Sequence, residues 1–188
     1  MTSFTHRLAT RSDVPELREL ISVAIGDLQR SFLTEAQITA SRSIMGLDTQ
    51  LVDDGTYFVI LSEDRIAGCG GWSDRATLYG GDHSGGRDAA RLDPARDPAR
   101  VRAMYTHPDF ARRGVGRLIL ALCEKTAREA GFGSLELMAT LSGRPLYESA
   151  GFRVVEQIVD DAGGAPVPLI RMRKLVPRVP GPDRLDGV

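Results

Sequence analysis

Apolar residues follow the period of a strand or of a helix along successive stretches of the N-terminal half. Residues 5–9 form a short run that predicts a first strand. Over residues 14–28, apolar side chains recur three or four positions apart, which predicts an amphipathic helix. Thr34 and Gln37 have the spacing of a capping box, so we expect a second helix from Thr34 towards Met45.

Two apolar runs at residues 56–61 and 65–72 are separated by the polar turn Ser62-Glu63-Asp64. They predict a hairpin, and so three antiparallel neighbouring strands at the start of a sheet. Gly68, Gly70 and Gly71 inside the second run indicate a bulge or a close backbone approach.

Residues 73–100 show no convincing period and contain two Gly-Gly pairs and a tandem Asp-Pro-Ala-Arg repeat. A stretch of this length without periodicity inside a domain is usually either functional or disordered. We interpret it as an irregular insertion between the third and fourth strands. The sequence leaves open whether this insertion is ordered.

The pattern over residues 101–130 is that of a strand, a loop and a helix. Val101, Ala103 and Tyr105 alternate with other residues, which predicts that their side chains share one face of a half-buried strand. From residue 115 to residue 127, apolar residues recur at helical spacing.

Three further strands are predicted in the C-terminal part, at residues 135–140, 152–159 and 167–174. We therefore expect a single domain over residues 1–175. The Pro-containing tail, residues 176–188, is expected to be extended and partly disordered.

Composition places this pattern in a soluble globular protein. Of the 188 residues, 42% are hydrophobic and 26% charged, and no apolar run has the length of a membrane span. The net charge of −1 argues against broad nucleic-acid binding. The first residues lack the apolar core of a signal peptide, so we expect a cytoplasmic protein without a membrane partner. Cys69 and Cys123 lie at apolar positions, which favours two buried thiols over a disulfide or metal pair.

The loop before the predicted helix carries Arg112, Arg113, Gly114, Gly116 and Arg117. The first N–H groups of a helix lack partners within it and carry the positive end of its dipole, so they bind anions. Glycines allow a phosphate to approach these donors, and the arginines add charge, which makes a diphosphate the natural ligand.

The spacing excludes two familiar phosphate loops. A P-loop needs four residues between its glycines and then Lys with Ser or Thr, whereas here only Val115 separates them and Arg117 follows. A dinucleotide fingerprint needs a small residue three positions after Gly116, where Ile119 stands.

The loop instead resembles the acetyl-CoA loop of the Gcn5-related N-acetyltransferase (GNAT) family: Gln or Arg, two residues, Gly, one residue, Gly or Ala. The pattern covers Ala111 to Gly116, with Ala111 where the family prefers Gln or Arg. Further along, Tyr147 followed by Gly151-Phe152 resembles the family's last helix and the turn after it. The resemblance covers Phe4 to Lys174.

This resemblance implies an α/β fold, with a mixed, mostly antiparallel sheet of about seven strands flanked by about four helices. It implies an acyltransferase that moves an acetyl group from acetyl-CoA to a primary amine of a small molecule or peptide, with no metal. Backbone groups of Met104, Tyr105 and Thr106 would hold the pantetheine arm. The loop would hold the diphosphate through Ala111, Arg112, Arg113, Gly114, Val115, Gly116 and Arg117. Tyr147 would protonate the departing thiolate, although it could instead anchor the last helix to the core.

The sequence leaves the general base, the acceptor and the oligomeric state open. The general base could be His107, Asp74, Tyr105, His83 or a water molecule, and no spacing decides between them. Thr140 and Gly143 stand where the family often has Asn and Ala. The acceptor amine cannot be identified, and a homodimer is left open. A non-catalytic acyl-CoA-binding module and a nucleotide-binding protein are the alternatives.

Overall fold

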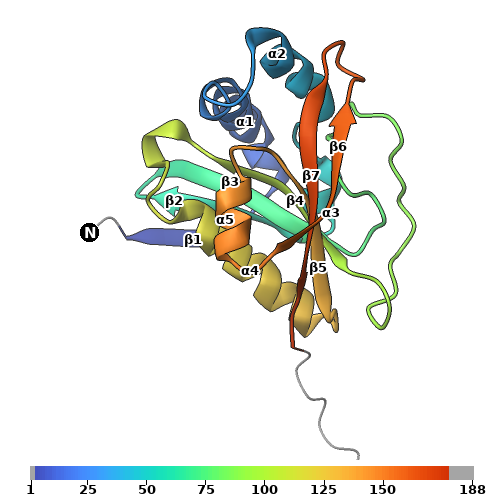
Figure 1. Cartoon of the computed structure of the whole chain (residues 1–188). Helices are drawn as coiled ribbons and strands as arrows, with labels where there is room; N and C mark the ends of the chain where they lie inside the picture. Colours follow the sequence, from blue (N-terminus) through green and yellow to red (C-terminus); the bar gives the residue numbers. More distant parts are fainter. Residues whose placement is uncertain (1–2, 178–188) are drawn as a thin grey trace, which may run out of the picture.

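The computed structural model, described here over residues 3–177, contains one seven-stranded sheet (Figure 1). The strand order is β1-β2-β3-β4-β5-β7-β6, and all neighbours are antiparallel except β4 and β5. The strands are β1 (Phe4–Leu8), β2 (Tyr57–Ser62), β3 (Arg65–Ser73), β4 (Ala99–Thr106), β5 (Ser134–Ala139), β6 (Arg153–Asp160) and β7 (Val167–Leu175). The predicted mixed, mostly antiparallel sheet is confirmed.

Five α-helices accompany the sheet within the described residues, one more than expected. They are α1 (Val14–Leu28), α2 (Glu35–Ile44), α3 (Thr49–Asp53), α4 (Val115–Glu129) and α5 (Arg144–Ser149). The capping box predicted for α2 is confirmed, because Thr34 Oγ1 accepts from the Gln37 amide at 3.3 Å and Gln37 Oε1 accepts from the Thr34 amide at 3.0 Å. Helix α3 was not predicted, because its five residues are too few to show a helical period.

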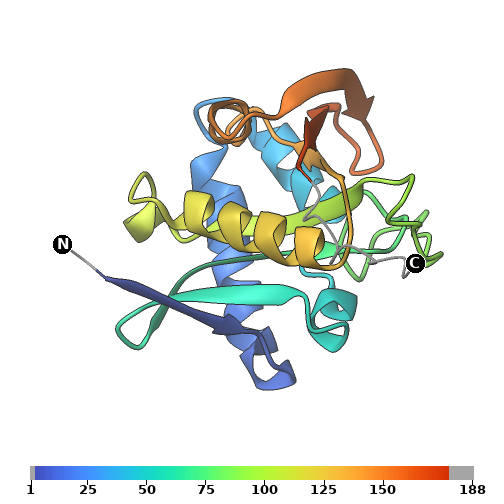
Figure 2. The same ribbon diagram turned by 90° about the horizontal axis from the view of Figure 1, so that it is seen from below.

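Helices cover both faces of the sheet. The apolar side of α4, together with Tyr147 of α5, packs on one face, while α1 packs on the other face over β2 and β3. On that second face, α2 packs against β7. Figure 2 shows β1 and β2 at one end of the molecule and β6 and β7 at the other, with α4 crossing between them.

The close backbone approach predicted at the β3 glycines is present. A Cβ on Gly68 would lie 2.5 Å from Val115 Cγ1, and one on Gly70 would lie 2.6 Å from Ile119 Cγ2. The first turns of α4 therefore rest directly on the β3 backbone. This contact fixes where the N-terminus of α4 meets the sheet.

The predicted shared face of Val101, Ala103 and Tyr105 is wrong. Val101 packs on the α4 side, whereas Ala103 and Tyr105 pack with the α1 cluster. Between the pairs Gly71↔Arg102 and Cys69↔Tyr105, β4 has one more residue than β3, so β4 carries a bulge. Ala103 adopts φ +50° in this bulge, and Tyr57 Oη donates to its carbonyl oxygen at 2.8 Å.

The β4 and β5 strands separate soon after they meet. They pair only at Ala99↔Leu135 and Arg100↔Glu136. Over the described residues, no strand pairs with the β5-facing edge of β4 beyond Arg100. The sheet is thus split at its centre, next to the bulge.

The insertion between β3 and β4 is ordered by polar contacts. Arg75 donates to Asp54 at 2.7 and 2.8 Å, and Arg87 pairs with the buried Asp48. Tyr79 Oη donates to Asp160 Oδ2 at 2.9 Å, which ties the insertion to β6.

At the C-terminal end, Val176 is buried, and its amide donates to the Gly133 carbonyl at 3.0 Å. The rest of the predicted disordered tail, from residue 178 onward, lies outside the described residues. Among the helices of residues 3–177, none combines the length and the apolar character needed to cross a membrane.

Candidate active site

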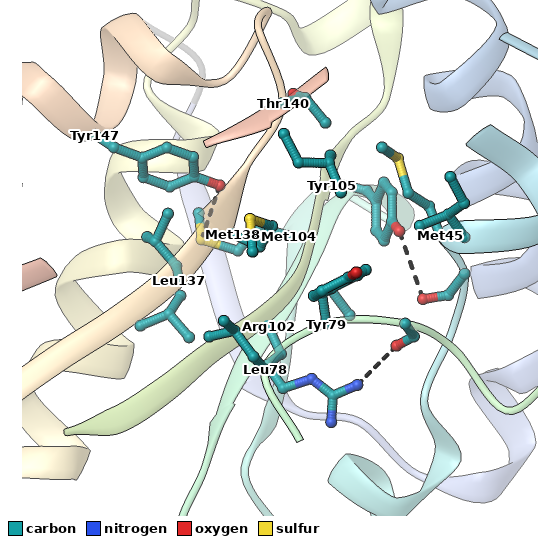
Figure 3. Close-up of a pocket in the computed structure, with 16 residues that line it drawn as sticks. Met45, Leu78, Tyr79, Arg102, Met104, Tyr105, Leu137, Met138, Thr140 and Tyr147 are labelled. Atoms are coloured by element: carbon teal, nitrogen blue, oxygen red, sulfur yellow. Dashed lines mark hydrogen bonds between the residues drawn. The ribbon is translucent and has the colours of Figure 1, made fainter. Parts of the chain in front are cut away.

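A cavity of about 90 Å³ lies where β4 and β5 separate. Since about 10–15 Å³ suffices for one water molecule, it has room for a small reacting group. Figure 3 shows the tyrosine rings and the methionine side chains around it. Its lining comes from β4, β5, β7, α5, the α2 C-terminus and the insertion, and includes Arg102, Met104, Tyr105, Tyr147, Met138 and Tyr79.

Tyr147 reaches this cavity from α5. Gly143 precedes the helix and Pro145 stands in its first turn, where a proline costs no backbone hydrogen bond. The Tyr147 hydroxyl lies 3.8 Å from the Met104 sulfur, a weak acceptor (Figure 3). Burial raises the pKa of Tyr147, so the phenol stays protonated at neutral pH. A protonated hydroxyl with only a weak protein partner is available to donate to a ligand.

The unpaired edge of β4 forms the wall opposite β5. Met104 lies in the bulge and Tyr105 and Thr106 follow it, and Tyr105 and Thr106 pair with β3 on their other side. Backbone groups that point away from β3 there lie in the gap between the two strands. An extended chain placed in that gap can use them as a strand partner.

The loop before α4 turns through left-handed backbone conformations. Arg112 has φ +63° and Gly114 has φ +94°, and α4 then begins at Val115. The first amides of α4 lack intrahelical partners, and successive amides around a left-handed residue form an anion-binding concavity. The sequence-predicted loop therefore has the backbone shape that a phosphate site requires.

The arginines of this loop are exposed at its surface. Arg112, Arg113 and Arg117 are all exposed, and the Arg113 guanidinium lies over the Phe110 ring at 5.4 Å from its centroid. Gly116 has another function, because a Cβ there would lie 2.8 Å from Leu146 Cδ2. It lets α5 pack closely against the start of α4, which places the Tyr147 helix beside the loop.

Only one of the four side chains considered as a general base lines the cavity. That residue is Tyr105, and burial raises its pKa, so its hydroxyl is a proton donor at neutral pH and not a base. His107 accepts from the Asp109 amide at 3.2 Å, Asp74 pairs with Arg91, and His83 contacts the Arg42 carbonyl oxygen at 2.9 Å.

A buried ion pair that was not predicted from the sequence lies at the edge of the cavity. Arg102 donates to Asp48 Oδ2 at 2.6 Å and to the Gly80 carbonyl oxygen at 2.7 Å (Figure 3 shows the Arg102 side chain). Arg102 side-chain exposure is 3% and that of Asp48 is 1%. Arginines at alternate positions of a central strand, Arg100 and Arg102, were the signal that could have indicated it.

The residues described contain no group of three or more His, Cys, Asp or Glu side chains that could hold a metal ion. Cys69 and Cys123 are buried free thiols, as predicted. Burial raises the pKa of Cys69 to about 12, so this thiol is neutral and unreactive at neutral pH.

Comparisons with known proteins agree with this geometry. A family profile described as "Acetyltransferase (GNAT) domain" matches residues 53–154, more than half of the chain. No curated protein sequence gives a significant match.

Three solved structures illustrate the likeness of the fold. A GCN5-related N-acetyltransferase from Rhodopseudomonas palustris has a TM-score of 0.70 at 15% identity, covering 94% of this chain and 98% of that one. The yncA protein of Salmonella typhimurium, solved with its cofactor acetyl-CoA, has a TM-score of 0.61 at 20% identity, with coverages of 96% and 98%. The PaiA N-acetyltransferase of Thermoplasma acidophilum, solved with coenzyme A, has a TM-score of 0.61 at 14% identity, with coverages of 92% and 99%.

Proposed function

The chain belongs to the GNAT family of acetyltransferases, and from this premise we propose that it transfers an acetyl group from acetyl-CoA to a primary amine. The acceptor is a small molecule or a peptide, and the amine attacks the thioester directly while both substrates are bound. The observation that carries the proposal is that the separated β4 and β5 strands and the Tyr147 residue line one cavity. The left-handed loop before α4 lies next to the Tyr147 helix, because Gly116 packs against Leu146.

Acetyl-CoA binds along the central gap in this proposal. Its diphosphate lies on the loop of Arg112 to Arg117, at the N-terminus of α4, where backbone amides and arginine charge favour it. Its pantetheine arm lies along the unpaired edge of β4 at Met104 to Thr106. The complexes of yncA with acetyl-CoA and of PaiA with coenzyme A support the choice of this cofactor.

The chemistry needs a polarised carbonyl and a protonated leaving group. Backbone N–H groups at the β4 edge stabilise the oxyanion that forms on the thioester carbonyl, as preorganised donors do in acyl transfer. Tyr147 donates its proton to the CoA thiolate as the carbon–sulfur bond breaks. Its raised pKa keeps the proton in place until the thiolate forms.

The acceptor amine must lose a proton before it attacks. An amine with an unperturbed pKa of about 10.4 is less than about 0.1% neutral at pH 7. No carboxylate or imidazole lines the cavity within the described residues. The three tyrosines that line it, Tyr79, Tyr105 and Tyr147, all have raised pKa values and are protonated at neutral pH. Water in the cavity therefore carries the proton away in this proposal.

The test is release of free CoA from acetyl-CoA in the presence of a panel of amines. We expect turnover with at least one class of amine, and no release without an amine. Stabilisation by CoA without turnover on any amine would indicate a non-catalytic acyl-CoA-binding module. Stabilisation by ATP or NAD but not by CoA would contradict the proposal and favour a nucleotide-binding protein.

A further inference from the structure

A cluster of arginines surrounds one buried carboxylate on the sheet face that bears the cavity. Glu136 of β5 has 0% exposure. Arg173 donates to its Oε1 through Nε at 3.1 Å and through a terminal nitrogen at 2.8 Å. Arg171 lies 3.0 Å from the same oxygen, and Arg100 donates to Oε2. Three cations thus share a single buried anion.

The strand register places this cluster directly beside the cavity. Met138 lines the cavity and pairs across the sheet with Arg171. Leu169 also lines the cavity, and it lies two residues before Arg171 on the same face of β7. Glu136 stands two residues before Met138 on β5, and Arg100 stands two residues before the cavity residue Arg102 on β4. Two residues of a strand span roughly 6.6 Å. The cluster therefore lies within the length of a small molecule bound in the cavity.

The charges of the cluster do not balance. Over residues 3–177, the other acid that pairs with an arginine of the cluster is Glu156, 3.6 Å from Arg171 with a side-chain exposure of 54%. Arg153 of β6 faces Arg173 in the strand register and brings a further cation to this edge. Burial lowers the pKa of Arg100, Glu136 opposes this effect, and the charges of Arg171 and Arg173 lower it further.

The arginines also keep unused donors. The Nε atoms of Arg100 and Arg171 are buried and make no hydrogen bond, and the same holds for Nε of Arg102 at the cavity. The side chains of Arg171 and Arg173 are 31% and 43% exposed, so a ligand can reach their exposed parts, though not the buried Nε atom of Arg171. Guanidinium groups with spare donors and excess charge match a carboxylate or a phosphate.

We propose that this cluster of Arg100, Arg171 and Arg173 around Glu136 binds an anionic group of the acceptor. The proposal rests on the proposed function and narrows it: the acceptor is an amine that also carries a carboxylate or phosphate group. Glu136 holds the three guanidinium groups in place, and Arg171 and Arg173 contact the anion. The amine then points towards the β4–β5 gap.

The experiment compares matched amines that differ only in charge. One pair is a dipeptide with a free C-terminal carboxylate and the same dipeptide with a C-terminal amide; the other is phosphoethanolamine and ethanolamine. We expect kcat/KM at least tenfold higher for the anionic member of one pair, and which pair responds identifies carboxylate or phosphate. Equal kcat/KM within both pairs would overturn the inference and leave the proposed function standing.

The variant Arg171→Ala/Arg173→Ala tests the assignment of the residues. Arg100 still pairs with Glu136 in it, so the buried carboxylate keeps a partner. We expect kcat/KM for the anionic amine to fall at least tenfold, with the neutral amine and the KM for acetyl-CoA unchanged. Arg171→Lys retains part of the preference, and Arg11→Ala, which removes an exposed arginine paired with Asp53, leaves it intact. An unchanged preference in the double variant would contradict the proposal.

Direct binding separates this inference from the proposed function. Succinate and inorganic phosphate are titrated into the wild type and into the Arg171→Ala/Arg173→Ala variant while the melting temperature is followed. If no amine is acetylated, the proposed function fails, and the cluster is then judged by binding alone. Stabilisation of the wild type by either anion that is lost in the double variant supports the site, whereas equal responses in the two proteins refute it.

Discussion

At the scale of single residues, Tyr147 gives the sharpest test of the chemistry. Tyr147→Phe removes one hydroxyl whose protein partner is a methionine sulfur at 3.8 Å. If the hydroxyl protonates the CoA thiolate, kcat falls by up to about 10²–10⁴-fold, the usual contribution of positioned proton transfer. Stability hardly changes, because the lost contact is weak. Both kcat and the melting temperature are measured on the same preparation, and an unchanged rate in single-turnover reactions would remove Tyr147 from the mechanism.

A second residue-scale prediction concerns the buried ion pair at the cavity. Asp48→Asn removes the charge shared by Arg102 and Arg87, and breaking a buried pair from one side typically costs about 3–5 kcal/mol. Asp53→Asn is the control, because its partner Arg11 is exposed and solvent screens such surface pairs, so little stability should be lost. Urea unfolding measures both. Equal losses of unfolding free energy in the two variants would mean that the Asp48 pair stabilises no more than a surface pair.

At this scale, the motif residues were predicted from the sequence, whereas the buried charges were not. Tyr147 and the glycines of the loop were indicated because they stand at family spacings. Arg102 and Glu136 were missed because charged residues that alternate with apolar ones in a strand are typical of a solvent-exposed face. Here other charged side chains cover them, and these partners, Asp48 and Arg173 among them, lie far away in sequence.

At the scale of secondary structure, the bulge of β4 shapes the strand edge along which we propose that acetyl-CoA binds. Ala103 has φ +50°, which β-branched residues avoid, so Ala103→Val costs about 1–3 kcal/mol or flattens the bulge. We expect a lower melting temperature and a higher KM for acetyl-CoA. Ala103→Gly is the matched control: glycine adopts positive φ freely, so both quantities stay near the wild-type values. If the valine variant has normal stability and KM, the bulge does not shape the cofactor site.

Periodicity predicted the long elements and failed at local departures from regular structure. The helix over residues 14–28 and the capping box at Thr34 follow from spacing alone, and the structure contains both. The bulge was missed because alanine carries no signal for a positive φ, so Val101 and Ala103 were assigned to one face. The order of the insertion depends on long-range ion pairs such as Arg75–Asp54, which no local pattern predicts.

At the scale of the whole molecule, three carboxylates with lowered pKa values predict that the free energy of unfolding falls in acid. The hydrogen bond from Arg7 lowers the pKa of Asp13, and that from Arg75 lowers the pKa of Asp54. Burial alone would raise the pKa of Glu136, but Arg173, Arg100 and Arg171 outweigh it and lower the pKa.

Because these folded-state pKa values lie below the unfolded values of about 3.9–4.3, the unfolded chain binds more protons in acid. The stability that these three carboxylates contribute is fully present above about pH 5 and is lost as the pH falls below about 4. Urea unfolding at pH 7, 4 and 3 measures it, and Asp54→Asn should show a shallower loss than the wild type. Stability that stays constant down to pH 3 would contradict the account.

The fold class, the strand order at the start of the sheet and the family could all be anticipated from the sequence. The cavity could not, because it depends on how β4 and β5 diverge and on which insertion residues close over the gap. Tyr79 reaches it only through the path of the insertion and its hydrogen bond to Asp160.

Calorimetric titration of coenzyme A into the wild type, Gly114→Ala and Gly114→Asp tests the central claim most directly. Gly114 precedes α4 at φ +94°, and a Cβ built there meets no atom within 4 Å, so alanine adds only local backbone strain. Aspartate adds a negative charge beside the proposed diphosphate as well. We predict binding to the wild type, affinity within about tenfold of it for the alanine variant, and a far larger loss, more than about 100-fold, for the aspartate variant, the difference reflecting charge repulsion. Equal affinity in all three proteins, or no binding to the wild type, would contradict the assignment of this loop as the coenzyme A site.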